Sequence, residues 1–435
     1  MKNKAEFEKA TKGLADQILR SYYFESGPTR ANRNSDRMVP GVKSAPMQFD
    51  FPIFVDLPSI VVAGLMLRRM MPIQFGSIPV AKAKDFILGL VNDNIASFFD
   101  TTPPSDRTTN YLNAISETGR TKFHQFIQQV VTAGPPMQTF SFPLSSVSVA
   151  SRYDGSNFYV VSGDDVGSEH PESALEGHKA IQAINAWIGC SAAFSENAQK
   201  TKRIVLGAMS LRLPQIERTQ KTLASPADGF VTHNPLTWST SREHMPPIGY
   251  DITINEDDTW WLDKIDRLLE AKTDPDCWTK KAIEYFYLGW FLNENDRVPF
   301  NFMTLDALFG QENINDPKTG KDIGNQKKLE LGVPKLLSQD IDIKRLADLY
   351  GLRCQFMHGG SPDIYDAKKY DQYIHKYSCD PTIDIEFLAA SCLRRQLFGI
   401  DFQMQPNPYE TDIQNLKNRG IIPTQYSLQT IIQET

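Results

Sequence analysis

The residues best suited to chemistry are Arg353 and His358, which stand five positions apart and precede a pair of glycines. Leu346, Leu349 and Arg353 recur at intervals of three and four residues, so the arginine occupies a position where the buried face of a helix calls for an apolar side chain. An unpaired guanidinium is costly to bury. The pattern therefore predicts that a carboxylate or a bound phosphate meets Arg353, and Asp306 on the preceding predicted helix is the internal candidate.

His358 lies about 140° further round the same helix than Arg353, at about 100° per residue. Gly359 and Gly360 follow it, as is typical of a helix C-terminus, so its imidazole is expected at an accessible edge. A histidine beside an arginine is the minimum needed to cleave RNA without a metal, because imidazole transfers protons while guanidinium neutralises the scissile phosphate. The alternative is structural: the histidine favours the helix dipole and the arginine forms an ion pair.

The elements that must position these residues belong to a predicted all-α region. The sequence pattern changes from mixed helical and extended to purely helical at about residue 250, after which helical patterns follow one another without strands. The change is marked by Pro246, Pro247 and the acidic stretch from Glu256 to Asp258. The segment 275–292 is apolar on nearly every side and is expected to be central. Further helices are predicted over 299–309, which carries Asp306 and is followed by a polar loop, over 341–357, which carries Arg353, and over 383–397.

The first 250 residues combine helical and extended patterns. Helices are predicted over 4–22, 81–99, 110–132 and 172–196, strands over 49–55, 139–150 and 157–162, and either a strand or a short helix over 203–213. The fold class is therefore α+β. We expect a mixed α/β domain over 1–250, with a sensor or targeting role and room for two subdomains, a helical domain over 251–402, and a polar tail over 403–435.

The helical region resembles a known family. The stretch from Arg353 to His358 matches the R-x(4–6)-H motif of HEPN ribonucleases, and its surroundings, LY-x-x-R-x-x-x-x-HG from Leu349, resemble the Apea-like HEPN branch. The segment 302–309, FMTLDALF, resembles the ALEALF-type helix of that branch. The resemblance covers about residues 256–400.

This resemblance implies a small helical bundle that forms a homodimer, in which two Arg/His motifs build one composite site, and an RNA-cleaving role in antiviral (phage) defence or as a toxin. It makes Arg353 and His358 the catalytic pair and gives Asp306 the acidic, orienting position. Two residues depart from the family pattern: Cys354 stands where many active members have a polar residue, and Asp306 is one methylene shorter than the usual glutamate. The function expected is a metal-independent endoribonuclease regulated by the N-terminal domain. The alternative is a non-catalytic RNA-binding or protein-assembly module.

Composition bounds these expectations. The chain has 435 residues, with 46 Lys and Arg against 52 Asp and Glu, a net charge of −6, so any phosphate site must be local. The five cysteines form no CxxC motif, which favours reduced thiols and a cytoplasmic protein. No apolar run approaches the roughly 18 residues that span a bilayer, and no membrane association is expected.

No cofactor or metal is expected either. One acidic and histidine-rich stretch has ligand-type side chains, but their spacing matches no known metal site, and we interpret it as a solvated loop. Its residues are Asp164, Asp165, Glu169, His170 and His178. Trp260 and Trp261 are expected in the core rather than as platforms on which bases stack.

Overall fold

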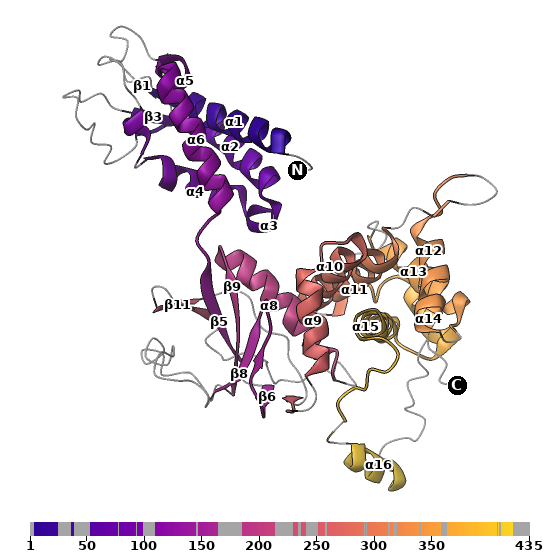
Figure 1. Ribbon diagram of the computed structural model, residues 1–435. Helices are drawn as coiled ribbons and strands as arrows, with labels where there is room; N and C mark the ends of the chain where they lie inside the picture. Colours follow the sequence, from indigo (N-terminus) through magenta and orange to yellow (C-terminus); the bar gives the residue numbers. More distant parts are fainter. Residues whose placement is uncertain are drawn as a thin grey trace. The chain divides into compact units, whose positions relative to one another are not determined.

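The computed structural model describes residues 4–24, 36–38, 53–76, 78–92, 94–98, 109–144, 147–163, 185–213, 229–233, 236–240, 251–256, 259–290, 292, 294–311, 314–315, 320–338, 341–357, 363–406, 408 and 410–420. The protein is α+β, with mostly antiparallel sheets in its first half and a helical C-terminal region, as the sequence predicts (Figure 1). It forms two compact units, Met1–Met137 with Ala192–Asn197, and Gln138–Ser191 with Ala198–Thr435.

The first unit is mainly helical. Its strands form a sheet in the order β2-β3-β1-β4, in which β1 is antiparallel to both β3 and β4. The elements are α1 Lys4–Ser21, β1 Tyr22–Phe24, β2 Asp36–Met38, β3 Ile53–Asp56, α2 Leu57–Met70, α3 Pro72–Phe75, α4 Val80–Asn92, η1 Ile95–Phe98, β4 Thr109–Asn110, α5 Tyr111–Ala114 and α6 Glu117–Ala133.

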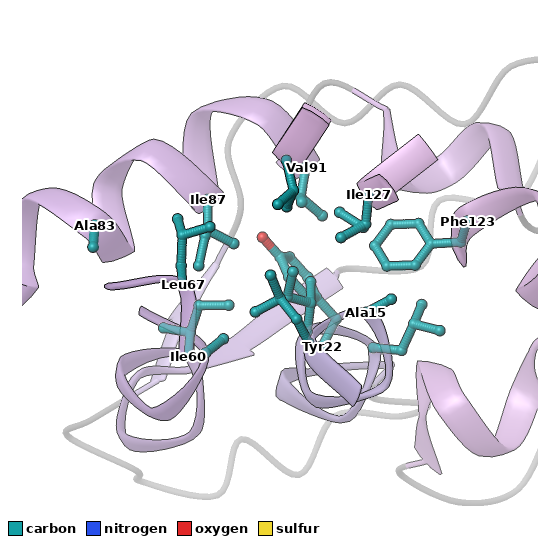
Figure 2. Close-up of a cluster of buried hydrophobic side chains, with 14 of the residues drawn as sticks. Ala15, Tyr22, Ile60, Leu67, Ala83, Ile87, Val91, Phe123 and Ile127 are labelled. Atoms are coloured by element: carbon teal, nitrogen blue, oxygen red, sulfur yellow. The ribbon is translucent and has the colours of Figure 1, made fainter. Parts of the chain in front are cut away.

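Side chains from α1, α2, α4 and α6 meet in one hydrophobic core, which Figure 2 shows around Tyr22. The ring of Tyr22 is fully buried, and its hydroxyl donates a hydrogen bond to Asn92 Oδ1 at 2.8 Å. At the edge of this core, Asp16 of α1 accepts hydrogen bonds from Arg120 Nη2 at 2.6 Å and from His124 Nε2 at 2.7 Å, both on α6. These bonds fix α1 against α6.

The helix predicted over 110–132 is interrupted, so that prediction is wrong in part. Ser116 has extended backbone and its hydroxyl accepts a hydrogen bond from Gly119 N at 3.0 Å, which makes it the N-cap of α6. A side chain at Gly119 would lie 2.3 Å from the carbonyl oxygen of Phe98. The glycine therefore permits a close approach of two backbone segments that periodicity alone does not reveal.

The second unit contains a sheet in the order β11-β10-β5-β9-β8-β7 and a separate parallel pair, β6 with β12. Its elements before residue 255 are β5 Gln138–Leu144, β6 Val147–Val149, β7 Tyr153–Asp154, β8 Tyr159–Ser162, β9 Ala186–Ala192, α8 Ser195–Ser210, β10 Gly229–His233, β11 Leu236–Thr240 and β12 Ile252–Ile254. Residues 203–210 are helical, the second of the two forms predicted.

The helix predicted over 172–196 is wrong at Ala186–Ala192, which is a strand; of the described residues in that range, only the last two are helical, at the start of α8. Trp187, Ile188 and Cys190 are buried on both faces of this strand. A strand buried on both sides is a continuous apolar run, which periodicity cannot separate from a buried helix. The part of the prediction before residue 185 lies outside the described residues.

The rest of the second unit is helical. α10 is buried mainly in its C-terminal half, where Ile283, Phe286 and Tyr287 are fully enclosed, whereas Cys277 and Lys281 are exposed, so the prediction of burial on nearly every side holds only in part. The helices are α9 Trp260–Glu270, α10 Asp274–Gly289, α11 Glu294–Phe309, α12 Asn325–Leu337, α13 Ile343–Met357, α14 Lys368–Tyr377, α15 Pro381–Phe398 and α16 Glu410–Asn418.

Two predictions in this region need correction. α11 begins at Glu294 rather than at Pro299, because the turn before the proline is held by buried Val298 and by an ion pair between Arg297 and Glu386 of α15 at 2.8 Å. The polar loop expected after Phe309 contains α12, whose Leu329, Val333 and Leu337 are buried on one face. Three buried apolar residues among many polar ones give only a weak apolar periodicity.

Hydrogen bonds join α9 and α15 to the part of the second unit that contains the sheet and α8. Asp266 of α9 accepts hydrogen bonds from the backbone of Ser156 and Asn157, in the turn between β7 and β8, at 2.9 and 2.8 Å. Arg394 of α15 donates to the carbonyl oxygens of Leu211 and Leu213, just after α8, at 2.8 and 2.7 Å. β12 follows the predicted boundary at residue 250, so the expected absence of strands there is wrong; the division into domains at that point stays a prediction.

None of the helices in the described parts of the chain is long and apolar enough to cross a membrane.

Candidate functional site

Asp306 and Arg353 meet where α11 packs against α13. Arg353 Nη2 donates a hydrogen bond to Asp306 Oδ2 at 2.6 Å, so the carboxylate that meets the arginine is the one expected from the sequence. The side chains are 19% and 18% exposed. The pair is therefore at the margin of the core, where one side of the guanidinium can reach solvent.

Apolar neighbours on the same two helices explain this position. Phe302 and Leu305 of α11 are buried, as are Leu349 and Leu352 of α13. Asp306 directly follows Leu305, so its side chain projects from the edge of the buried face of α11. The packing of leucines brings the two helices together, and the ion pair forms at the rim of that contact.

Tyr350 is a third member of the cluster. Arg353 Nη1 donates a hydrogen bond to the Tyr350 hydroxyl at 3.1 Å, and the guanidinium carbon lies 5.0 Å from the centre of the Tyr350 ring. The ring of Phe302 meets Tyr350 edge to face at 6.4 Å and 89°. In the sequence, Tyr350 stands only within the LY-x-x-R motif; its spacing of three residues from Arg353 is the signal that places both side chains on one helix face.

Burial and charge act in opposite directions on this cluster. Burial raises the pKa of Asp306 above its ordinary value, although the charge and hydrogen bond of Arg353 and a hydrogen bond from Asn325 each lower it. Burial also raises the pKa of Tyr350, partly opposed by the charge of Arg353, so the phenol is protonated at neutral pH. Among the described residues, neither Asp306 Oδ1 nor Arg353 Nε, both buried, has a hydrogen-bond partner.

A second arginine on α13 provides a comparison. Arg345 Nε donates to Asp384 Oδ2 of α15 at 2.8 Å and lies 2.9 Å from the hydroxyl of Tyr373 on α14, which itself donates to Asp384. The side chains of Arg345 and Asp384 are only 7% and 4% exposed. This network is closed to solvent and holds three helices together, whereas the Arg353 pair is open on one side.

The structure bears on the other predicted site residues to different degrees. α13 ends at Met357, and His358, the next residue, lies outside the described residues. Cys354 is partly buried beside Arg353 in the chain, with a free thiol. Trp261 is buried as expected, but Trp260 is 39% exposed, so only one of the two indoles is in the core.

The candidate metal cluster from Asp164 to His178 lies outside the described residues. Among the residues that are described, no group of three or more His, Cys, Asp or Glu side chains is placed to hold a metal ion.

Comparisons with models of protein families, with curated proteins and with solved structures found no match to this chain. A guanidinium held at the surface by a carboxylate and a phenol presents planar N–H donors in a fixed direction. Such an arrangement suits an oxyanion, and a phosphate above all.

Proposed function

We propose that this protein is a metal-independent endoribonuclease of the HEPN type, which uses Arg353 and His358 and acts in antiviral defence or toxin-like RNA cleavage. The observation that supports this most directly is the partly exposed Arg353, held by Asp306 on the inner side of α13. In the sequence, His358 follows the last residue of that helix. The proposal includes a homodimer formed through the helical region, control by the N-terminal part, and a cytoplasmic location.

The reaction needs two operations. The 2′-hydroxyl of one nucleotide attacks the adjacent phosphorus while the bond to the 5′-oxygen of the next nucleotide breaks, which leaves a 2′,3′-cyclic phosphate and a 5′-hydroxyl. Imidazole chemistry at His358 moves the protons, and the guanidinium of Arg353 stabilises the negative charge that builds up on the phosphate oxygens. Asp306 contributes by orienting the guanidinium, since its carboxylate binds one terminal nitrogen.

Cleavage of RNA by the purified full-length protein in the presence of EDTA tests this function. We expect His358→Ala to reduce the rate by about 10²- to 10⁴-fold, the usual contribution of a general acid or base. Arg353→Lys should lose most of the activity as well, because lysine keeps the charge but lacks the planar fork.

Arg267 is exposed on α9, and Arg267→Lys serves as the control for the arginine substitution. A folded His358→Ala protein that cleaves at the wild-type rate would show that the catalytic assignment is wrong.

The second candidate is a non-catalytic RNA-binding or assembly module. It is favoured by the ion pair between Arg353 and Asp306, in which the two charges already balance each other, as they do between Arg345 and Asp384. This candidate predicts RNA binding, or self-association, without cleavage under any condition. A binding titration beside the cleavage assay separates the two functions.

A further inference from the structure

The donors of Arg353 can be counted one by one. A guanidinium carries five N–H groups, one on Nε and two on each terminal nitrogen. One N–H of Nη2 binds Asp306 and one N–H of Nη1 binds Tyr350. Nε is buried, with no partner among the described residues. One N–H on each terminal nitrogen remains for a further acceptor, and these two are called the outer N–H groups below.

A single anchor would not fix the direction of the outer N–H groups. With Asp306 alone, the guanidinium could turn about its one strong hydrogen bond. The hydroxyl of Tyr350 holds the other terminal nitrogen, and the ring lies against the cation at 5.0 Å, a distance at which cation–π attraction is effective. Two anchors on two different nitrogens determine the plane of the guanidinium.

Tyr350 is itself held in place. Its ring makes the edge-to-face contact with buried Phe302, which lies on α11, one turn before Asp306. Both groups that hold the guanidinium are thus fixed by α11: Asp306 belongs to that helix, and Tyr350 packs against its Phe302. A donor group fixed in this way requires little reorganisation when an anion arrives.

We propose that Tyr350 is a positioning residue of this site, which fixes the guanidinium of Arg353 so that its two outer N–H groups face an incoming phosphate. The inference rests on the proposed function for its choice of anion. Its physical content is the fixed orientation of Arg353, and that can be measured with or without catalysis.

Tyr350→Phe is the central variant, because it keeps the ring and the contact with Phe302 and removes only the hydroxyl. Tyr373→Phe is the matched control: it makes the same change beside the other arginine of α13, in the closed network of Arg345. The first readout is the rate at which the two terminal nitrogens of Arg353 exchange by rotation, followed by nitrogen NMR on protein labelled at arginine. The second is kcat and KM for RNA cleavage.

We expect Tyr350→Phe to accelerate the nitrogen exchange of Arg353 several-fold and to lower kcat about tenfold with KM nearly unchanged, as for an orienting group. Tyr373→Phe should lower thermal stability and leave both readouts at Arg353 unchanged. Unchanged exchange in a folded Tyr350→Phe protein, or a rise in KM alone, would overturn the proposal. If the wild type cleaves no RNA but Tyr350→Phe still accelerates the exchange, the positioning role holds and the endoribonuclease proposal fails.

Should Tyr350→Phe fail to fold, Phe302→Leu provides the second variant. It keeps the hydroxyl of Tyr350 and removes the aromatic edge that fixes the ring. A smaller acceleration of the Arg353 exchange is expected, and no acceleration would count against the proposal.

Discussion

Removing the buried carboxylate of Asp384 should destabilise the protein far more than removing the partly exposed carboxylate of Asp306. In Asp384→Ala, Arg345 would keep the hydroxyl of Tyr373 but lose its counter-charge in a place where only 7% of its side chain is exposed. Leaving one partner of a buried ion pair uncompensated costs about 3–5 kcal/mol. Tyr373 would lose the acceptor of its own hydroxyl proton at the same time.

The same substitution at Asp306 leaves Arg353 with 19% exposure and with the hydroxyl of Tyr350 as a remaining acceptor. Water can solvate the outer N–H groups of this guanidinium, so the loss should be closer to that of one charged hydrogen bond, about 1.5–3 kcal/mol. Asp384→Ala is therefore expected to cost roughly twice as much. Both arginines lie on α13 and both substitutions are Asp→Ala, whereas the two pairs differ in burial.

Urea unfolding followed by tryptophan fluorescence measures both variants, with the midpoint compared at an unchanged slope so that the free energies of unfolding refer to the same transition. Arg267→Lys on the exposed side of α9 sets the baseline. Equal midpoints for Asp384→Ala and Asp306→Ala, or a larger loss at Asp306, would refute the reasoning that burial decides the strength of these pairs.

Three further outcomes are expected. Because burial raises the pKa of Asp306 in the folded protein, the native state holds that proton more tightly than the unfolded chain. The stability of the wild type relative to Asp306→Asn should therefore fall as the pH rises above about 3.8. Urea unfolding at several pH values measures this, and a rise in stability would contradict the effect of burial. At Asp16, burial raises the pKa of the carboxyl, but the hydrogen bonds and charges of Arg120 and His124 outweigh burial and lower it. The difference in free energy of unfolding between the wild type and Asp16→Asn should therefore be largest at neutral pH and disappear as the pH falls below 3.8. If the site is composite, mixing wild type with excess His358→Ala should reduce cleavage as the square of the wild-type fraction, whereas a linear fall would indicate independent sites.

Helices with one clearly apolar face could be predicted well. α1 ends one residue from its predicted limit and α13 begins two residues after its own, because three- and four-residue spacing directly reflects which side faces the core. β9 could not be predicted, since both of its faces are buried. α12 and α14 were missed because their buried side chains are few and separated by charged ones.

The candidate site divides in the same way. Arg353 on an inner helix face requires a partner in any fold, because the free energy cost of burying an unpaired guanidinium is too high. This requirement can be derived from the sequence alone. The role of Tyr350 depends on the direction in which its hydroxyl points. The spacing places Tyr350 on the same helix face as Arg353 but does not determine that direction.

By itself, the sequence determined that this chain has helical periodicity around Asp306 and Arg353 and that an arginine interrupts an apolar face. Only the tertiary structure decided that one arginine of α13 is enclosed and the other open. Arg345 is covered by residues 28 and 39 positions away, Tyr373 and Asp384, on two later helices. Exposure is set by which distant elements pack over a side chain, and that long-range packing is absent from any local pattern.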